Sequence, residues 1–541
     1  MHSRRLHRRV PYYSEVHNMS AALLYRNFLS YSLLFLLVCF LSVCSSGQSN
    51  LDVGTIPPQN NVPPAILEKA QRLTNNLVSN GYEVSRGYLN LFGIDQCPTA
   101  IAVMGNCYGN NPVAPYIFYV FPPWPNEYVD PSTRNAFGRL PDGYISAHRF
   151  DPREAIIVIG NLPPLGRYFG YQTYLFTKKS TINTSDPTYL FLQTNLPSML
   201  DMLFNTSPNP DRLTIFGSIG NSINNVVIEW QAGTAFNQER VFITTPDQAM
   251  ERNIKAALLA TGVANVKDIF VEPVSSDYRI GLSADSDDFI TAFRYAMPQD
   301  NEAGDKWRSD LPLVVLRVRG KNTTRPAEPY PPATLDARTA NSENSLKIDL
   351  QNLIGAVKDD WGQASATTKE FLDAQTTLDL VGPHCNLNHG GPNYGMNCLG
   401  DTQDTSYQPT LGLNIDNNEV YTVIGTLQSE TGNASYVNLS IYDNAALFGV
   451  VSIDDAKLVA TANRYSGKTG NTDKLYVYYI TRDCSKNVFT SSGACTSITE
   501  DIIPKTKQIK IIQRGYVRPG AARGPDSTQI LKPYLVLLNG S

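Results

Sequence analysis

Histidine and charged residues are scarce in this sequence, and their scarcity excludes several kinds of catalysis. The 541 residues include six His, and Asp, Glu, Lys and Arg together make up 17%. Three of the His lie before residue 18, which leaves His148, His384 and His389 for any chemistry of the mature protein. The sequence has no G-x-S-x-G and no H-E-x-x-H pattern, the local signatures of α/β-hydrolases and zinc proteases. We therefore expect that the protein is not an enzyme of either class.

A surplus of basic charge is also missing, and this argues against binding to nucleic acid. Five Arg and one Glu give residues 1–47 a charge of +4, so the net charge of −4 leaves −8 on the remaining residues. Nucleic-acid-binding proteins usually carry the opposite sign. The 42% of hydrophobic residues exclude a disordered chain, and 29 Tyr, 37 Gly and 35 Pro favour an extracellular protein rich in strands and loops.

One long apolar run stands out near the N-terminus, LLFLLVCFLSV at residues 33–43. Arg26 precedes it and the polar stretch CSSGQSN follows it, as in a secretory signal peptide. A membrane-spanning helix needs about 20 apolar residues, which this run does not reach. We predict that residues 1–47 are a signal peptide, with translation starting at Met1 or Met19. The mature protein is then secreted and extracellular, without a stable membrane anchor.

Six of the eight cysteines follow this leader and form three close couples. Each couple closes a loop of about a dozen residues, and the couples are far apart, so pairing within each couple is favoured among the 15 connectivities that six cysteines allow. No couple has the C-x-x-C spacing of a zinc site. We predict the disulfides Cys97–Cys107, Cys385–Cys398 and Cys484–Cys495. A zinc site in which His384 and His389 join Cys385 and Cys398 is the alternative.

Six N-x-S/T sequences follow the leader, and in a secreted protein each is an acceptor for N-glycosylation. They predict a glycoprotein. The acceptors are Asn183, Asn205, Asn322, Asn433, Asn438 and Asn539. Asn433 and Asn438 flank a predicted strand, so occupancy of both is not assumed.

The polar, Pro-rich segment 321–345 divides the mature chain into two domains. We expect an N-terminal β-rich domain with helical insertions at residues 48–320, and a helix followed by a C-terminal β-rich domain at residues 346–541. Apolar residues at helical spacing predict helices over residues 66–77, 286–297 and 346–361, and a further helix between the Thr245-Pro246-Asp247-Gln248 capping box and Gly262. Strands are expected over residues 266–271 and 311–320, and in short segments after residue 410.

The two predicted domains share three sequence blocks in the same order. Residues 156–176 align with 421–443, through V-I-G-x-L and a strand that contains Tyr174 or Tyr442. FGSIGNSINN (216–225) aligns with FGVVSIDDAK (448–457), and VFITTPD (241–247) with VYYITRD (477–483). An insertion of about 30 residues near 177–211 accounts for the different spacing. We therefore predict a mainly β fold with added helices (α+β), in which an internal duplication gives two related β-sandwich-like domains.

Part of the second domain resembles a known family. The blocks ASYVNLSIYD (434–443), ANRYS (462–466) and LYVYYI (475–480) are similar to the C-terminal member of a pair of domains of unknown function, found together in bacterial secreted and periplasmic proteins. The turn containing Asn463, Arg464, Tyr465 and Ser466 matches most closely. The resemblance covers residues 434–480 and implies a β-rich, sandwich-like fold. It implies no activity.

The loop between Cys385 and Cys398 is the strongest candidate for a functional site. Asn, Asp and Gly are concentrated in this loop and in its extension to residue 404. Such oxygen ligands suit a hard cation such as calcium, although the EF-hand register is absent. We predict a rigid, exposed loop in which Asp401 and Asp404 bind calcium. A weaker second cluster contains Asp285, Asp287 and Asp288.

Two further stretches each have a structural and a functional interpretation. PYIFYVFPPWPNEY (115–128) is typical of a core strand followed by a Pro-rich turn, and its aromatic rings would also stack on sugars. A basic strip near the C-terminus reads as a strand with its charges outward. It would dock on the acidic body of the protein or attract sulfated polysaccharide. Its residues are Lys505, Lys507, Lys510, Arg514, Arg518 and Arg523.

We expect a secreted glycoprotein without catalytic activity that acts in an extracellular matrix, at a surface or on carbohydrate. The low His content, the missing catalytic motifs and the local disulfides favour this class. The alternative is a secreted hydrolase that cleaves polysaccharide with two carboxylates, which must stand about 5–10 Å apart across a cleft. The sequence singles out no such pair.

Overall fold

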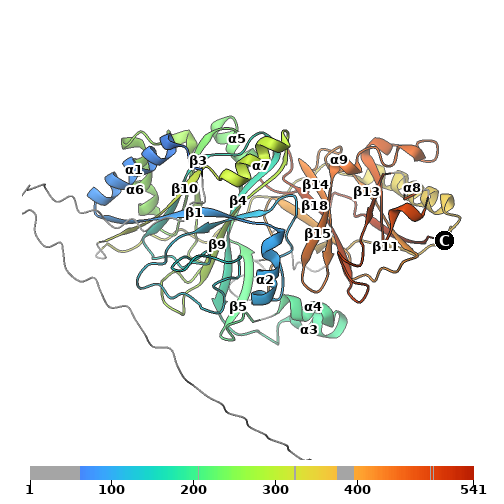
Figure 1. The fold of residues 1–541 in the computed structure, drawn as a ribbon, viewed down its shortest axis with the longest axis horizontal. Helices are drawn as coiled ribbons and strands as arrows, with labels where there is room; N and C mark the ends of the chain where they lie inside the picture. The colour runs from blue at the N-terminus through green and yellow to red at the C-terminus, as the bar shows by residue number, and fades with distance from the viewer. Residues whose placement is uncertain are drawn as a thin grey trace, which may run out of the picture. The chain divides into compact units, whose positions relative to one another are not determined.

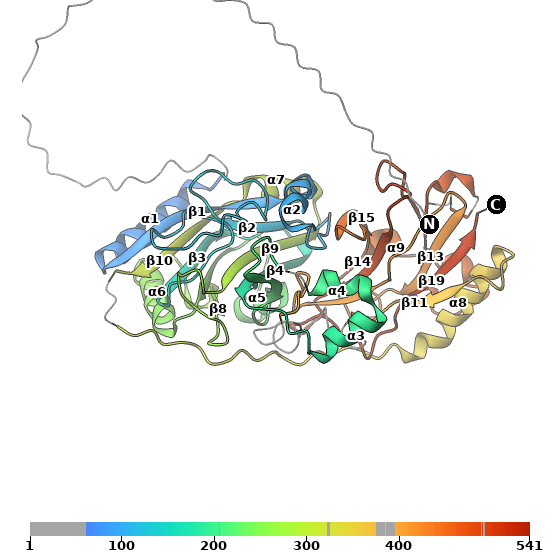
Figure 2. The same cartoon turned by 90° about the horizontal axis from the view of Figure 1, so that it is seen from below.

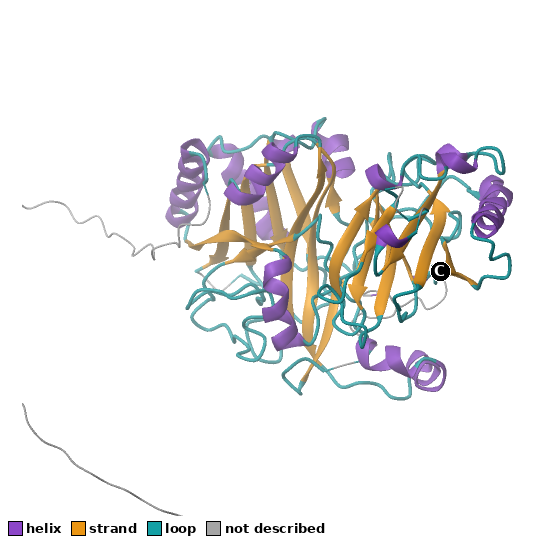
Figure 3. Ribbon diagram, turned by 45° about the vertical axis from the view of Figure 1, so that its right-hand side comes forward, coloured by secondary structure: helices purple, strands orange, loops and turns teal. Residues whose placement is uncertain are grey.

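The structure is a computed structural model that describes residues 61–540 except 205, 322–324, 375–384, 386–394, 488, 491 and 492. The predicted signal peptide therefore lies outside the described residues. The described chain forms one unit of mixed α+β structure that is mainly β, with sheets curled into half-barrels (Figures 1 and 3). The fold class predicted from the sequence is confirmed.

The first lobe, residues 61–320, contains one curved sheet of ten strands. The order is β5-β4-β9-β2-β1-β10-β3-β7-β8, with β6 beside β4. Strand β1 joins the two halves of the sheet, because residues 82–87 pair with β10 and residues 88–92 pair with β2. The strands are β1 (Tyr82–Phe92), β2 (Tyr116–Val120), β3 (Glu154–Asn161), β4 (Gly166–Lys179), β5 (Arg212–Ser218), β6 (Ile223–Asn224), β7 (Glu239–Thr245), β8 (Ile269–Pro273), β9 (Asp288–Pro298) and β10 (Leu313–Gly320).

Both faces of this sheet are covered. Apolar stripes of α1 and α6 pack on one face, where Leu73 and Ile254 meet Ile157 of β3. On the other face, Val158 of β3 and Phe293 of β9 lie in one core, because the sheet curls until its two halves face each other. The helices of this lobe are α1 (Pro64–Ser79), α2 (Cys97–Met104), α3 (Pro187–Asn195), α4 (Pro197–Leu203), α5 (Asn225–Ala232), α6 (Gln248–Ala260) and α7 (Asn301–Asp310).

The second lobe has two sheets over one core. Their orders are β11-β19-β13-β16-β17 and β15-β14-β18-β12. Val423 of β13 and Leu439 of β14 meet in the core between them, and α8 packs Leu353 and Val357 on the outer face of the five-stranded sheet. The elements are α8 (Lys347–Asp360), β11 (Thr368–Glu370), β12 (Thr405–Pro409), β13 (Glu419–Thr426), β14 (Tyr436–Asp443), β15 (Phe448–Asp454), α9 (Asp455–Leu458), β16 (Leu475–Thr481), β17 (Cys495–Ser497), β18 (Ile509–Tyr516) and β19 (Tyr534–Asn539).

Strand order and register confirm the predicted duplication. In chain order, β1 to β5 and β7 to β10 correspond to β11 to β15 and β16 to β19, and every neighbour pair except β1–β2 recurs. Both copies contain one parallel pair, β7–β8 and β16–β17. Ile159 pairs with Val241 in the first copy and Ile424 with Val477 in the second, which is the register that the sequence alignment requires.

The two copies differ in two ladders, β1–β2 and β4–β6, and in the predicted insertion. The β1–β2 ladder has no counterpart, because β11 has three residues and pairs with β19 alone. The second lobe therefore matches the expected sandwich, whereas the first lobe is a single curled sheet. The insertion predicted near residues 177–211 contains α3 and α4, which lie against the second lobe (Figure 2).

Two details predicted from periodicity are wrong. Residues 286–297 contain strand β9 and not a helix, since Phe289 faces one core and Ile290 faces another. A short apolar run that is buried on both faces cannot be distinguished from a helix by its periodicity. Helix α6 begins after Asp247, whose carboxylate accepts a hydrogen bond from the Ala249 amide, and Thr245 ends β7 instead of capping the helix.

The predicted linker runs along both lobes. Tyr330 forms a β-bridge with Ser275 of the first lobe, and Arg338 donates hydrogen bonds to the carbonyls of Gln403 and Thr405, both at 2.9 Å. The described chain forms one unit, so the division into two domains at residues 321–345 stays a prediction.

Candidate functional site

The contact between the lobes repeats one arrangement of arginine and tyrosine. Arg294 of β9 pairs across the sheet with Tyr116 of β2, and Arg514 of β18 pairs with Tyr407 of β12 in the equivalent register. Each guanidinium lies 5.6 Å from the ring centre of its paired tyrosine. The two clusters meet, because Arg294 also lies 5.8 Å from the ring of Tyr516 in the second lobe. All five side chains are buried, so this contact holds the lobes together.

The loop before β2 closes this contact on one side. Asn110 donates to the Gly449 carbonyl at 3.1 Å, and the Gly449 amide donates back to Asn110 Oδ1 at 2.7 Å. A Cβ at residue 449 would lie 2.4 Å from the Asn110 carbonyl oxygen, so only glycine allows this approach. Asn111 donates to the Tyr516 hydroxyl at 3.0 Å, across the same contact.

Asp401 and Asp404, predicted as calcium ligands on an exposed loop, are both 0% exposed. Asp401 accepts hydrogen bonds from the Ser218 amide at 3.0 Å and hydroxyl at 2.9 Å, and burial raises its pKa to about 7. Asp404 accepts from the hydroxyls of Tyr168 and Thr402. No group of three acids, histidines or cysteines among the described residues could hold a metal ion. The predicted exposure of Asp401 and Asp404 is therefore wrong, because donors from the first lobe cover these carboxylates. Residues 386–394 of the predicted loop lie outside the described residues.

The weaker acidic cluster is also structural. Asp288 accepts hydrogen bonds from the Thr177 amide at 2.7 Å and hydroxyl at 2.8 Å, and it lies 3.4 Å from the guanidinium of Arg149. Asp285 pairs with Lys179 at the surface. These contacts do not converge on a position for a cation.

The predicted disulfides Cys97–Cys107, Cys385–Cys398 and Cys484–Cys495 are all formed. The first two occupy equivalent places in the duplication, since one lies between β1 and β2 and the other between β11 and β12. The second bond uses both cysteines that the zinc alternative requires, and His384 and His389 lie outside the described residues. The zinc alternative therefore loses its two thiolate ligands.

Two of the six predicted glycosylation acceptors are unsuitable. Asn433 and Asn438 are 0% exposed, and Asn433 donates a hydrogen bond to Glu343 at 2.9 Å. A glycan cannot attach to an amide that is packed in the protein interior. Asn183 and Asn539 are exposed, whereas Asn205 and Asn322 lie outside the described residues.

Three of the six residues in the basic strip do not present their charges outward. Lys510, Arg514 and Arg523 are at most 8% exposed, and Arg523 donates to the Gln403 side chain at 3.0 Å. Nearer the surface, Lys505 pairs with Glu500 at 2.9 Å. These contacts agree with docking on the protein's own fold, and they leave little exposed charge for a sulfated polysaccharide.

A cleft in the first lobe joins an exposed indole to polar side chains. It lies beside α5 and residues 330–336 and has a volume of about 440 Å³. Helix α5 starts at its N-cap, Asn224, which accepts hydrogen bonds from the Val226 and Val227 amides, and the helix places Trp230 at the cleft. Trp230 is 61% exposed, while the other three tryptophans are buried or half-buried.

Glu272 of β8 is the buried acid of this cleft. Its carboxylate accepts hydrogen bonds from the Thr173 amide at 2.7 Å, from the Thr173 hydroxyl, and from the Thr244 hydroxyl at 3.1 Å. Burial raises the pKa of Glu272 to about 7. Donors from β4 and β7 thus hold both carboxylate oxygens and fix the carboxylate in place.

The rest of the lining mixes apolar side chains, such as Ile219, Val227 and Pro331, with polar groups, and its described residues carry no positive charge. Asn221, Ser222 and Ser275 contribute amide and hydroxyl groups, and Asp336 is the second acid. No Lys or Arg belongs to the described lining. An aromatic face beside neutral hydrogen-bonding groups is suited to a sugar ring, which has an apolar face and a hydroxylated edge.

Sequence reasoning missed this cleft. The aromatic stretch 115–128 is a core strand at β2, whose five residues are all buried, so the structural interpretation is confirmed there. Trp230 and Glu272 are 42 residues apart in the chain and share no motif. The FGSIGNSINN block was the one signal near the cleft, because its Asn221 and Ser222 line it.

Comparisons with known proteins add no functional assignment. No protein-family model matches the chain, and no curated protein is similar to it. The solved structures that are similar to this chain include two of low identity. One is an uncharacterized protein from Burkholderia cenocepacia, with 10% identity, a TM-score of 0.35, and coverage of 88% of this chain and 91% of that one. The other is the VPA0106 protein from Vibrio parahaemolyticus, with 8% identity, a TM-score of 0.33, and coverage of 82% and 99%.

Proposed function

We propose that this protein is a secreted, non-catalytic protein that binds neutral carbohydrate in the cleft beside Trp230. The observation that carries the proposal is the single exposed indole in a cleft lined by Asn, Ser and Glu side chains and by no described cation. Tryptophan faces stack on the apolar face of a sugar, and the polar groups fix its orientation. The absence of Lys and Arg from the described lining favours neutral over acidic sugars.

A polysaccharide hydrolase is the second candidate, since Glu272 and Asp336 both line the cleft and the pKa of Glu272 is raised to about 7 by burial. A general acid must give its proton to the leaving oxygen of the substrate. In Glu272 both oxygens accept hydrogen bonds from Thr173 and Thr244. This arrangement supports a fixed acceptor for a sugar hydroxyl more than a proton donor.

Loss of the Trp230 ring tests the proposal. We expect a neutral glycan identified on a glycan array to quench the tryptophan emission of the wild-type protein on titration. Trp230→Ala should weaken binding at least tenfold, because stacking on the ring is lost. Ile348→Ala is the matched control, since Ile348 is an exposed apolar residue (71%) on α8 in the other lobe. Equal affinity of both variants would contradict the proposal.

Glu272→Gln separates binding from hydrolysis. If the protein is a hydrolase, this variant loses the release of reducing ends from a polysaccharide that the wild type cleaves. If it only binds, neither protein releases reducing ends and the two differ in affinity alone. Release by the wild type that Glu272→Gln abolishes would replace the binding proposal with the hydrolase.

Secretion is part of the proposal, and the three disulfides support it, because disulfides persist in oxidising compartments. No helix within the described residues is long and apolar enough to cross a membrane. We expect the N-terminal sequence of the mature protein to begin near Gly47. In a host that glycosylates, peptide mapping should find glycan at the exposed Asn183 or Asn539 and none at the buried Asn433 and Asn438.

A further inference from the structure

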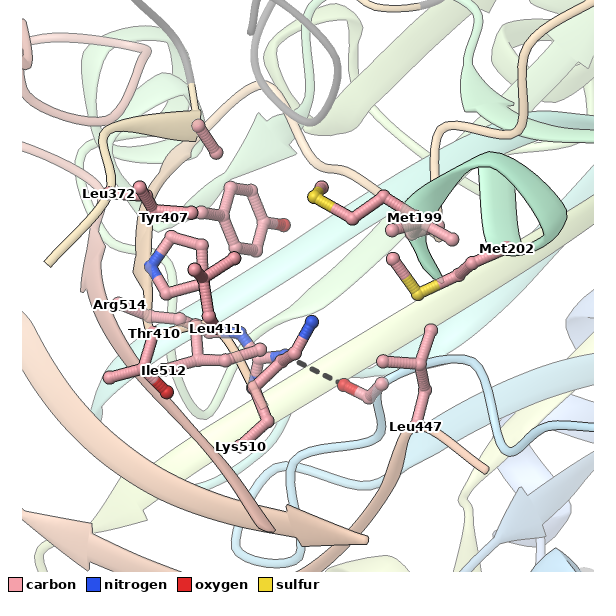
Figure 4. Close-up of a pocket in the computed structure, with 14 residues that line it drawn as sticks. Met199, Met202, Leu372, Tyr407, Thr410, Leu411, Leu447, Lys510, Ile512 and Arg514 are labelled. Carbon is pink, nitrogen blue, oxygen red and sulfur yellow. Dashed lines mark hydrogen bonds between the residues drawn. The ribbon is translucent and has the colours of Figure 1, made fainter. Parts of the chain in front are cut away.

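A second and smaller pocket lies where α4 of the first lobe meets β12 and β18 of the second (Figure 4). Its volume of about 70 Å³ compares with about 440 Å³ for the cleft beside Trp230. Most of the wall is apolar. Met199 and Met202 come from α4, and Leu411, Leu447 and Ile512 from the second lobe. The small volume and the apolar wall favour an alkyl chain over a sugar ring as the occupant.

Two cations line this apolar pocket. Lys510 and Arg514 project from the same face of β18, because they are four residues apart on a strand. Figure 4 shows both side chains extending into the space opposite Met199 and Met202. Lys510 is 8% exposed and Arg514 is 5% exposed.

Neither cation has an acidic partner among the described residues. Arg514 donates one hydrogen bond, to the Gly109 carbonyl at 2.7 Å, and its Nε and Nη1 have no partner. The ammonium of Lys510 makes no hydrogen bond or ion pair with any described residue, and burial lowers its pKa to about 8. A buried, unpaired ammonium is costly, and an anion bound in the pocket would remove that cost.

The duplication shows that the fold does not need a lysine at this position. In the second copy Tyr442 pairs with Lys510, and in the first copy the equivalent Tyr174 pairs with Ile290. Ile290 is fully buried in an apolar cluster. An apolar residue can therefore occupy this strand position, so the fold does not explain why residue 510 is a lysine.

We propose that this pocket binds a single-chain carboxylate with an apolar tail, such as a free medium-chain fatty acid, whose carboxylate pairs with Lys510 and Arg514. The two methionines of α4 line the tail, and their flexible side chains adapt to chains of different length. The carboxylate would supply the acceptor that Arg514 Nη1 and Lys510 lack. This site is separate from the carbohydrate cleft and does not depend on it.

Calorimetric titration of the full-length, disulfide-bonded protein with decanoate tests the proposal. We expect decanoate to bind below its micellar concentration, and decanol, which lacks the charge, to bind at least tenfold more weakly. Lys510→Met should lose at least tenfold in decanoate affinity, and Lys510→Arg should retain most of it. Lys507→Met is the matched control, because Lys507 lies three residues away, is half exposed and pairs with Asp443. Its affinity should stay within twofold of the wild type.

Two further readouts keep the proposal falsifiable. Without ligand, Lys510→Met should melt at the same or a higher temperature than the wild type, because an unpaired buried charge is removed. In the wild type, decanoate affinity should fall as pH rises from 7 to 9.5 and Lys510 loses its proton, whereas Lys510→Arg should keep its affinity. Equal binding of decanoate and decanol, unchanged affinity of Lys510→Met, no binding by the wild type, or a clear loss of stability in Lys510→Met without ligand would each overturn the proposal.

Discussion

The two copies of the duplicated sheet share their strand order and one buried arginine position, Arg294 and Arg514, but they bury further charges at different positions. In the first copy Arg317 of β10 pairs with Ile156 of β3, and in the second copy the equivalent Leu537 pairs with Tyr421. Arg317 is 0% exposed. The second copy instead buries Lys510, where the first has an isoleucine. The same strand pairing therefore tolerates a charged or an apolar side chain at one position, which shows that the strand ladders and not these charges define the fold.

The buried charge of the first copy is compensated, unlike that of Lys510. Arg317 donates to Glu127 at 2.7 Å and also pairs with Glu154, whose second oxygen accepts a hydrogen bond from the Trp124 indole at 2.9 Å. A compensated buried ion pair is a structural feature, whereas an uncompensated cation in a pocket indicates a ligand. The presence or absence of an acidic partner therefore distinguishes Arg317 from Lys510 more clearly than their burial does.

Replacing Arg317 with the residue of the second copy should have the largest effect. Arg317→Leu leaves Glu127 and Glu154 buried without their cation, and removing one partner of a buried pair costs about 3–5 kcal/mol. We expect this loss in the free energy of unfolding measured with urea. Leu537→Ala, in the equivalent strand position, removes only a half-buried apolar side chain and should cost less.

A combined variant sharpens that comparison. Arg317→Leu together with Glu127→Gln and Glu154→Gln removes all three charges and makes the site resemble the second copy. It should recover part of the stability that Arg317→Leu loses, because the uncompensated carboxylates are gone. If the single and the combined variants were equally unstable, the packing of Arg317 over the rings of Phe121 and Trp124 would be its main contribution instead.

The equivalent disulfides allow a second test of the two copies. Cys97–Cys107 and Cys385–Cys398 close loops with sequence separations of 10 and 13 residues. Chain entropy predicts almost the same loss for each, about 3 kcal/mol, when both cysteines of a pair become alanine. Thermal or urea unfolding of the two double variants measures it. If the two losses in the free energy of unfolding differ by much more than about 1 kcal/mol, the two disulfides stabilise the split and the continuous sheet unequally.

The smallest effect concerns Asp401, which follows the second disulfide and binds Ser218 of the first copy. Burial raises its pKa to about 7 in the folded protein, above the value of about 3.9 for an unfolded chain. The folded state therefore binds this proton more tightly, and the stability due to Asp401 is present below about pH 4 and lost as pH rises to about 7.

Asp401→Asn removes this titration while keeping the size of the side chain. Between pH 5 and pH 8 the free energy of unfolding of the wild type should fall by about 2.6 kcal/mol more than that of the variant. Glu154 and Glu272, whose pKa values burial also raises to about 7, titrate in both proteins and cancel in the difference. Parallel pH profiles would show that Asp401 stays ionised in the contact between the lobes.

Local patterns predicted the elements that have one buried face. The apolar stripe of α1 was recognisable because solvent on one side of the helix leaves a period in the sequence. Strand β9 was mistaken for a helix because both of its faces are covered and no period remains. The candidate calcium site failed for a related reason. Whether Asp401 meets water or Ser218 depends on the first lobe, which is more than 180 residues away in sequence.

The sequence by itself determined the duplication, the three disulfides and the mainly β class, because each depends on local spacing or on similarity between two stretches of the same chain. The tertiary structure alone decided which polar residues are functional candidates. Trp230 and Glu272 become neighbours in one cleft, and Lys510 becomes a cation in an apolar pocket, only when the sheets curl and the two lobes meet. The physical reason is that burial and charge compensation are set by contacts between distant segments, which local sequence does not encode.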